Sequence, residues 1–407
     1  MRPCLPIMLT VIVLAGVVSG AACGPRPAEG LGQPARGTLG FDARANRFTS
    51  IAALDRYVAV AWIATEATLG TDVYVAMSVD TGRTFADPIR INWRPGSARA
   101  GGEQPPRVAL VPRSAGPPDV VAFWLGRRTT GRVLLTTRSE DGGRTYAEPT
   151  LVAGTDTTGE RGWQTLSVGP EREIALAWVD HRRGASDLYI ATGVNDPDPR
   201  VIARDVCAGS RTALAHGRNG VMYAVWRHIF AADERDIAIA SSRDGGRTWT
   251  PPARISDDHW SSAGCPDEGP TMTVDSRGRL HLVWPTVVTT ADGVERTQLF
   301  YASSDNGTDF TTRLPIPFPH HARHPRVATL ADDTVAVTWD SPRGGRSHVW
   351  RTIGRAAADG TWTFDAPIDV GEGIYPAVAG TVEGLVLSWM TGEEPDAKIQ
   401  TRAEFLW

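Results

Sequence analysis

Lysine is almost absent from this sequence of 407 residues. Lys398 is the only lysine, and arginine supplies the other Lys and Arg side chains. Basic charge is not in excess either, since 42 Lys and Arg residues stand against 46 Asp and Glu residues and the net charge is −4. Proteins that bind nucleic acid or anionic membranes through charge carry a basic surface. The composition therefore argues against nucleic acid as a partner, and against a membrane surface held by charge.

Long apolar runs are also scarce. The run at residues 7–18 is shorter than the roughly 18–20 residues that a membrane-spanning helix needs. Arg2 precedes this run and small residues follow it, so residues 1–22 are predicted to be an export signal. Cys23 comes next, and small residues before a cysteine resemble a bacterial lipobox, whose cysteine is lipidated after cleavage. Gly20 departs from that pattern, and plain secretion is the alternative.

The mature chain is therefore expected to be exported, either as a membrane-anchored lipoprotein on the cell surface or the periplasmic side, or as a secreted protein. Residues 23–45 are rich in glycine and proline, a composition typical of a flexible tether.

Cysteine is rare, with four residues in the whole sequence. Cys4 belongs to the predicted signal and Cys23 to the predicted anchor, which leaves Cys207 and Cys265. Both precede an apolar strand in consecutive repeats, and an exported protein meets an oxidising compartment. We therefore predict a disulfide between them. Two thiols alone do not favour a metal site.

One eight-residue pattern recurs: Ser-x-Asp-x-Gly-x-Thr-aromatic. It is found at residues 78–85, 139–146 and 242–249, with a worn copy at 303–310. Short alternating apolar runs flank the copies, which predicts a β-hairpin at each. The carboxylate can accept hydrogen bonds from turn groups that no strand pairing satisfies. The pattern therefore predicts structural, not catalytic, aspartates at Asp80, Asp141, Asp244 and Asp305.

A second repeat counts the structural units. Seven apolar strands end in tryptophan, at Trp62, Trp124, Trp178, Trp226, Trp284, Trp339 and Trp389. Successive tryptophans are 48 to 62 residues apart, close to the roughly 40–50 residues of propeller repeats. Each unit holds about four short strands, called A to D in chain order, which is typical of a propeller blade.

We therefore predict an all-β protein, a seven-bladed β-propeller of four-stranded antiparallel blades over residues 46–407. The last unit lacks its outer strand. Part of residues 38–48 is predicted to supply that strand and so to close the ring.

The eight-residue pattern resembles the Asp-box, or bacterial neuraminidase repeat, of sialidases. The resemblance implies a sialidase-like propeller, which usually has six blades in that family and is the alternative to the seven counted above. It also implies three convergent arginines, a tyrosine activated by a glutamate, and an aspartate that acts as acid and base. Tyr375, at the start of the last inner strand, is similar in place to that tyrosine. Residues 265–270 and 235–237 resemble stretches of uncharacterised exported repeat proteins.

Connections between antiparallel strands alternate between the two faces of a propeller. The A–B turns share one face with the C–D turns that hold the eight-residue pattern. The B–C and D–A loops share the other face and are longer, with many charged and aromatic groups, so a site is expected there. The predicted ligand-binding residues are Arg127, Arg128, His181, Arg183, His228, Trp260, Arg323 and Arg343. The catalytic candidates are Arg182, Arg227, Asp267, Glu268 and Tyr375.

These observations favour a monomeric surface module that binds a glycan or a protein, without a cofactor. The alternative function is that of an exo-alpha-sialidase or a related glycoside hydrolase. A histidine group at His320, His321 and His324 lacks the spacing of metal ligands, so no metal site is predicted.

Overall fold

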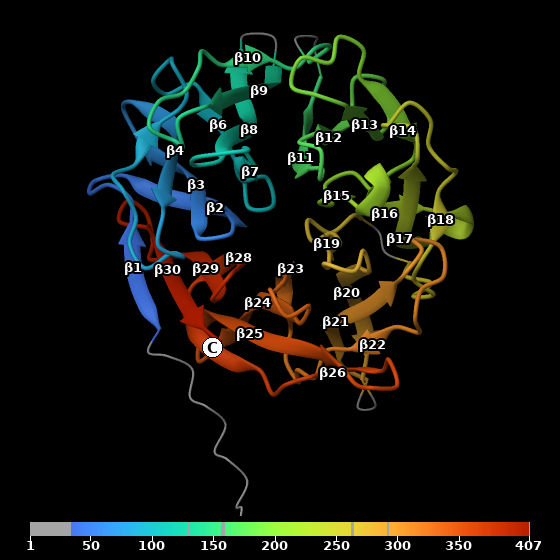
Figure 1. Ribbon diagram of the computed structural model, residues 1–407. Coiled ribbons are helices and arrows are strands. Elements are labelled where there is room, and N and C mark those ends of the chain that lie inside the picture. Colours follow the sequence, from blue (N-terminus) through green and yellow to red (C-terminus); the bar gives the residue numbers. More distant parts are fainter. Residues whose placement is uncertain (1–33, 129–130, 156–158, 262–263, 291–292, 407) are drawn as a thin grey trace, which may run out of the picture.

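The computed structural model describes residues 34–128, 131–155, 159–261, 264–290 and 293–406. Seven antiparallel sheets follow one another around a ring in chain order (Figure 1). The predicted all-β, seven-bladed propeller is therefore confirmed, and the six-bladed alternative is wrong. The predicted export signal and Cys23 lie outside the described residues. Among the described residues, no helix has the length and apolar character needed to cross a membrane.

The first strand of each blade in the chain packs against the first strands of the neighbouring blades and is innermost. Blade 1 comprises β2 (Ala45–Leu54), β3 (Tyr57–Glu66), β4 (Gly70–Ser78) and β5 (Ile89–Arg90). Blade 2 comprises β7 (Arg107–Val111), β8 (Asp119–Arg128), β9 (Gly131–Ser139) and β10 (Thr150–Leu151). Blade 3 comprises β11 (Arg161–Val168), β12 (Ile174–Asp180), β13 (Asp187–Ala191) and β14 (Arg200–Ala203). Blade 4 comprises β15 (Ala213–His216), β16 (Met222–Ile229), β17 (Arg235–Ser242) and β18 (Ala253–Arg254). Blade 5 comprises β19 (Thr271–Val274), β20 (Leu280–Thr289), β21 (Glu295–Ser304) and β22 (Leu314–Pro315).

Blade 6 comprises β23 (Arg323–Thr329), β24 (Val335–Arg343), β25 (Arg346–Ala356) and β26 (Trp362–Phe364). Blade 7 comprises β28 (Ile374–Thr381), β29 (Gly384–Thr391), β30 (Lys398–Phe405) and β1 (Ala35–Leu39). Two further short strands do not belong to the four-stranded pattern: β6 (Ala98–Arg99) pairs with β8, and β27 (Ile368–Glu372) pairs with β25. Two short 3-10 turns, η1 (Arg218–Gly220) and η2 (Ala231–Asp233), flank β16.

The first and last described strands meet in blade 7. Strand β1 pairs antiparallel with β30, from Ala35 opposite Ala403 to Leu39 opposite Ile399 (Figure 1). This strand begins earlier than the predicted segment 38–48, whose last residues belong to the inner strand β2. Residues 35–39 of the segment predicted as a tether are part of the propeller, and residues 23–33 lie outside the described residues.

The seven repeat tryptophans lie within the second strands, each of which continues beyond its tryptophan, unlike the prediction that the strands end there. Their side chains fill the spaces between blades. Trp62, Trp124, Trp178, Trp226, Trp284 and Trp339 are at most 1% exposed, and Trp389 is 5% exposed. Each packs against apolar residues of the preceding blade, as Trp124 does against Ile63 and Val75 of blade 1. A blade therefore buries its flat apolar faces only against its neighbours, which makes the ring one continuous core.

Hydrogen bonds of the predicted type hold three C–D turns. The carboxylates of Asp80, Asp141 and Asp244 each accept from a Ser hydroxyl two residues earlier and a Thr hydroxyl four residues later, at 2.6–2.8 Å. These bonds, above all that from Thr248, lower the pKa of Asp244 to about 2. The hydrogen bonds thus stabilise the ionised form of these carboxylates, which have a structural role in the turns.

The fourth copy of the pattern differs from the prediction. The acceptor there is Asn306, which binds the hydroxyls of Ser304 and Thr308, and the predicted Asp305 instead forms an ion pair with Arg279. The turn is one residue shorter in this copy and begins at Ser304. The residue two positions after that serine is therefore Asn306.

Cys207 and Cys265 form the predicted disulfide, which joins the D–A loops that follow blades 3 and 4. Their Cα atoms are 5.5 Å apart and they are separated by 58 residues in the sequence.

Replacing both cysteines by serine is expected to lower the free energy of unfolding by about 3–4 kcal/mol, because the unfolded chain loses a loop constraint of this length. Denaturant titration measures the change. Reductant should destabilise the wild type and leave the double variant unaffected, and a double variant as stable as the oxidised wild type would contradict the prediction.

Candidate functional site

The two faces of the ring carry different connections. The N–H of Thr81, in a C–D turn, donates to the carbonyl of Arg56, in the A–B turn of the same blade, at 2.9 Å. These two kinds of turn therefore lie together on one face. The B–C and D–A connections form the other face, which we call the loop face.

Four inner strands carry one extra residue near the loop face. The register of β2, β11, β23 and β28 against their neighbours shifts there. At each shift one residue has a positive φ: Phe48 at 54°, Trp163 at 51°, His324 at 53° and Tyr375 at 52°. Such a conformation costs on the order of 1–3 kcal/mol for a side chain other than glycine. Bulges of this kind turn a side chain away from its regular direction and are common beside functional sites.

The bulges bring three rings together where blades 6, 7 and 1 meet. The ring centroid of His324 lies 4.2 Å from that of Tyr375, and the centroid of Tyr375 lies 5.5 Å from that of Phe48. All three side chains are half-buried. They form an aromatic wall at the central end of the loop face.

His324 is held as a cation. Its Nδ1 donates to Oδ1 of Asp340 at 2.6 Å, and its Nε2 lies 3.8 Å from a carboxylate oxygen of Glu268. Burial lowers the pKa of His324, but the hydrogen bond and the charge of Asp340, with the charges of Glu103 and Glu268, outweigh it and raise the pKa to about 9. The imidazole therefore carries a positive charge at neutral pH.

Tyr375 is held as a neutral phenol. Burial, followed by the charges of Glu103 and Asp340, raises its pKa to about 12. Its backbone N–H donates to the same Asp340 oxygen at 3.0 Å, so one carboxylate ties the inner strands of blades 6 and 7 together. The hydroxyl reaches Gly102, where an added Cβ would lie 2.2 Å from the phenolic oxygen. A glycine at that position therefore makes room for the phenol.

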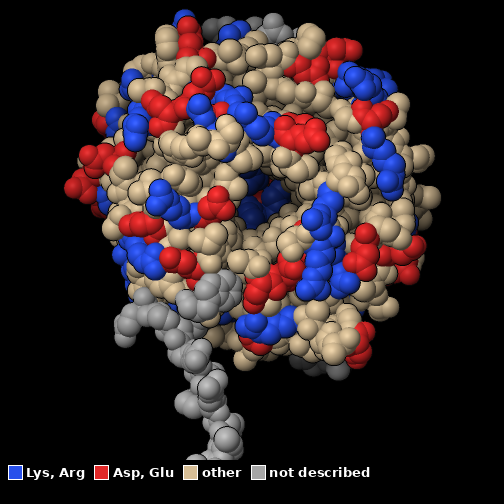
Figure 2. Space-filling view, in the orientation of Figure 1, with Lys and Arg blue, Asp and Glu red and all other residues tan. Residues whose placement is uncertain are grey.

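Beside the aromatic wall, an ion pair crosses the centre of the ring. The guanidinium of Arg211, which precedes β15 of blade 4, contacts the carboxylate of Glu103, which precedes β7 of blade 2, at 2.5 Å. Arg326 of blade 6 reaches the same carboxylate oxygen at 3.1 Å. Blades 2, 4 and 6 are not neighbours, so these contacts are made only through the centre. Figure 2 shows a hollow there, with basic side chains at its floor.

Arg211 also bonds to the backbone of two further blades. It donates to the carbonyls of Gly269 at 2.7 Å and Pro325 at 2.9 Å, and it is 3% exposed. Arg107 lies close to this cluster, and burial together with the charge of Arg326 lowers its pKa to about 9 against the opposing charge of Glu103. We call Glu103, Arg107, Arg211 and Arg326 the central cluster.

Several predicted residues lie at this centre. Asp267, Glu268 and Tyr375 come from the loops and strands of blades 5 to 7 that adjoin it, and the charges of Asp267 and Glu268 both contribute to the raised pKa of Tyr375. Arg323 is the first residue of β23, directly before His324 of the aromatic wall.

The other predicted residues lie away from the centre. Arg182 forms an ion pair with Asp180 at 2.5 Å, and Arg343 with Asp369. Arg227 donates to two backbone carbonyls and lies over the ring of Trp260. His181 bonds to Ser186, Arg183 approaches Asp187 to 3.9 Å, and the ring of His228 lies against Phe230. Arg127 and Arg128 line a separate cleft between blades 1 and 2.

The central cluster was missed in part by sequence reasoning. Glu103, Arg107 and Arg326 were not predicted, and a local signal existed. Proline stands at the start of four inner strands: Pro106 and Pro270 directly precede β7 and β19, and Pro325 and Pro376 are the third residues of β23 and β28. Aligning the repeats on this proline matches Arg107 with Arg326, the residues that follow it, and both belong to the central cluster.

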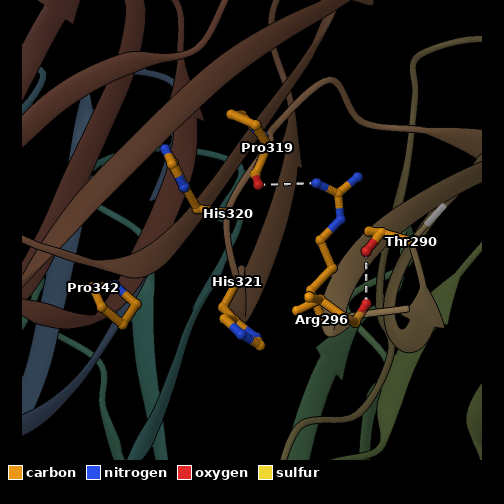
Figure 3. Close-up of a pocket in the computed structure, with 7 residues that line it drawn as sticks. Thr290, Arg296, Pro319, His320, His321 and Pro342 are labelled. Carbon is orange, nitrogen blue, oxygen red and sulfur yellow. Dashed lines mark hydrogen bonds between the residues drawn. The ribbon is translucent and has the colours of Figure 1, made fainter. Parts of the chain in front are cut away.

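The histidine group divides between two places. His324 joins the aromatic wall, whereas His320 and His321 line a peripheral pocket of about 590 Å³. Figure 3 shows their rings pointing in different directions, and Arg296 reaching the carbonyl of Pro319 at 2.9 Å. Elsewhere, Glu234, Asp236 and His259 lie close enough to hold a metal ion, but the guanidinium of Arg254 already pairs with both carboxylates.

Neither a protein-family model nor a curated protein matches the chain. Solved structures do. A PL25 ulvan lyase shows 10% identity over 89% of this chain and 95% of its own, with a TM-score of 0.56. The polysaccharide lyase Uly1 shows 13% identity over 88% and 90%, with a TM-score of 0.54. A Hadza microbial sialidase, Hz136, shows 14% identity over 88% of this chain and 65% of its own, with a TM-score of 0.48. The chain thus shares its fold with the two polysaccharide lyases.

Replacing Glu103 by glutamine is expected to lower the free energy of unfolding by about 3 kcal/mol, because it leaves two buried guanidinium groups without a counter-charge. Glu160, whose side chain is 64% exposed and pairs with Arg132 at 2.8 Å, provides the matched control. The same change there should alter stability by about 0.5 kcal/mol or less. Equal effects in denaturant titrations of the two variants would contradict a buried cross-ring pair.

The raised pKa of His324 predicts a pH dependence. A group whose pKa rises on folding from 6.5 to about 9 stabilises the fold fully below pH 6.5, and this contribution is lost as the pH rises through 9. The wild type should therefore lose stability over that interval, and His324→Gln should lose less. His259→Gln, at a side chain that is 61% exposed, is the control. Denaturation midpoints across this pH range test the prediction, and parallel curves for wild type and His324→Gln would refute it.

Proposed function

We propose that the protein is an exported glycan-binding module whose main site lies at the central end of the loop face. The observation that carries the proposal is the aromatic wall of Phe48, His324 and Tyr375, held by strained bulges beside a dense set of charged groups. Sugar sites typically combine apolar ring faces with a few fixed polar groups. The strain at the bulges is accounted for if these rings must face a ligand.

Binding fits the electrostatics of the centre better than sialidase chemistry does. Three arginines gather there, but Glu103 already occupies their midst, so no open clamp for a substrate carboxylate remains. Tyr375 has a raised pKa, whereas a nucleophilic tyrosine needs help to lose its proton. The arginines Arg182 and Arg227, proposed from the sequence, are engaged elsewhere.

A second candidate function rests on the contact between His324 and Tyr375. The imidazolium can neutralise the carboxylate of an acidic sugar, Glu268 can accept a proton from the adjacent carbon, and the neutral phenol can donate a proton to the departing glycosidic oxygen. This elimination leaves a carbon–carbon double bond in the sugar. The shared fold of the two polysaccharide lyases supports considering it.

Export is part of the proposal. The signal-like residues 1–22 and the lipobox-like Cys23 support it, and so does the disulfide, since disulfides persist in oxidising compartments. We propose a monomer anchored at the membrane by a lipid on Cys23, with a glycan as its partner.

A glycan array probed with the purified protein tests the proposed function, alongside assays with a fluorogenic sialoside and with polyuronates. We expect binding without sialoside turnover. Phe48→Ala should weaken the binding by about tenfold, because it removes one face of the aromatic wall. Val382→Ala, at a side chain that is 47% exposed on the opposite face, is the control.

The same experiment separates the two candidates. A rise in ultraviolet absorbance from an unsaturated uronate, abolished in Tyr375→Phe, would establish elimination over simple binding. Sialoside turnover, or the absence of any bound glycan, would contradict the proposed function.

A further inference from the structure

A cleft of about 740 Å³ lies at the periphery of the loop face, between the D–A loop of blade 1 and the B–C hairpin of blade 2. Its lining includes Trp93 and Arg94 from the loop, Arg127 and Arg128 from the hairpin, and Glu148 from the outer edge of blade 2. None of these residues belongs to the central cluster or the aromatic wall. The volume lies in the range of about 300–1,000 Å³ typical of small-molecule sites. We call it the blade 1–2 cleft.

Trp93 is exposed in a protein that buries its repeat tryptophans. It is 59% exposed, whereas the seven tryptophans of the second strands are at most 5% exposed. Exposing an indole of this size to water is unfavourable. The side chain is therefore a candidate for contact with a ligand.

The three arginines of the cleft lack counter-charges of their own. Within the described parts of the chain, the side chains of Arg94, Arg127 and Arg128 make no hydrogen bond or ion pair. Two other arginines near this face are paired, Arg132 with Glu160 and Arg44 with Asp72. Glu148 is the one carboxylate in the lining, so the cleft has an excess of positive charge.

A rigid support holds the exposed indole in place. The amide of Asn92 donates to Asp72 at 2.8 Å and to the carbonyl of Arg94 at 2.8 Å, and the N–H of Gly96 donates to the same Asp72 oxygen. Both Asn92 and Asp72 are buried. The loop is thus fixed on both sides of Trp93.

The hairpin wall is fixed to the same loop. The N–H of Arg127 donates to the carbonyl of Ser97 at 2.9 Å, and β6 pairs with β8 at Gly126 and Leu125. The two walls therefore move as one unit, and the cleft is organised before any ligand arrives. Preorganisation of this kind reduces the entropy lost on binding.

We propose that the blade 1–2 cleft is a second sugar-binding site, which takes a sugar ring bearing a carboxylate or a sulfate ester. An indole offers a flat apolar face on which the C–H side of a sugar ring can stack. Guanidinium groups bind planar or tetrahedral oxyanions through paired N–H donors. A nucleic-acid strand fits less well, because it needs a long basic groove with successive stacking rings, and the chain carries a net charge of −4.

Isothermal titration of the full chain with three polymers tests the proposal: oligogalacturonate, dextran sulfate and neutral dextran. We expect binding to at least one of the two anionic polymers and none to neutral dextran. Preference for oligogalacturonate identifies a carboxylate sugar, and preference for dextran sulfate identifies a sulfate ester. Failure of both to bind would overturn the proposal, as would equal affinity for neutral dextran.

Variants locate the binding. Trp93→Ala and the double variant Arg127→Ala/Arg128→Ala should each weaken it by about tenfold or more, since tryptophan and arginine dominate such contacts. The double variant should also reduce the dependence of affinity on salt. Val79→Ala, 60% exposed on the opposite face of blade 1, and the exposed pair Arg144→Ala/Arg243→Ala are the matched controls. Equal losses in the control variants would show non-specific charge attraction and overturn the proposal.

A last pair of measurements keeps this site distinct from the central one. Binding that Trp93→Ala weakens and Phe48→Ala does not belongs to this cleft, whereas binding that only Phe48→Ala weakens belongs to the main site. Either site can therefore fail its own test without affecting the other. A single-stranded oligonucleotide should compete poorly with the polymer. Competition at equal affinity would assign the cleft to nucleic acid and overturn the sugar assignment.

Discussion

The ring depends on a buried ion pair that crosses its centre. Arg211 joins Glu103 of blade 2 to the backbone of blades 5 and 6, and Arg326 shares the same carboxylate. A propeller otherwise ties each blade only to its two neighbours, through the tryptophan layers. A contact among blades 2, 4 and 6 limits how far the ring can open or flatten. Because the charges are almost without access to water, the geometry that pairs them is held strictly.

That constraint also determines what chemistry the centre can support. The Glu103 carboxylate occupies the position that the carboxylate of an acidic substrate would need. The protein's own carboxylate therefore neutralises much of the positive charge of the arginines at the centre. The groups that remain half-exposed are rings and the acidic side chains beside them. Sugar hydroxyls and ring faces suit such a surface, whereas an anionic sugar meets a better partner in the unpaired arginines of the blade 1–2 cleft. The two proposed sites thus differ in the chemistry they favour, although one rigid disc carries both.

The fold could be predicted from the sequence because its signals are local. Each tryptophan-ended strand reports one blade, and Cys207 and Cys265 sit at matching places in consecutive repeats. The centre could not be predicted in this way. Glu103 and Arg211 are far apart in the sequence and come from blades that are not neighbours, so only closure of the ring brings them together. Asp305 was assigned wrongly because a one-residue deletion in the fourth turn moves the acceptor to Asn306. Glu268 was predicted because its loop lies on the loop face, and Tyr375 because the start of the last inner strand adjoins that face.

Closure by β1 has a consequence for the order in which the molecule is completed. Of the described strands, β1 is synthesised first and its partner β30 last. Throughout synthesis β1 has no partner, and blade 7 remains an open edge. Pairing across nearly the whole sequence is slow, because the entropy of closing a long loop is lost before any contact between the two strands can form to offset it. The six other blades can stack in order as they emerge, and the ring is then sealed in one late step. Until that step, the apolar edges of blades 1 and 7 are exposed together, and the unfinished disc is most vulnerable to aggregation.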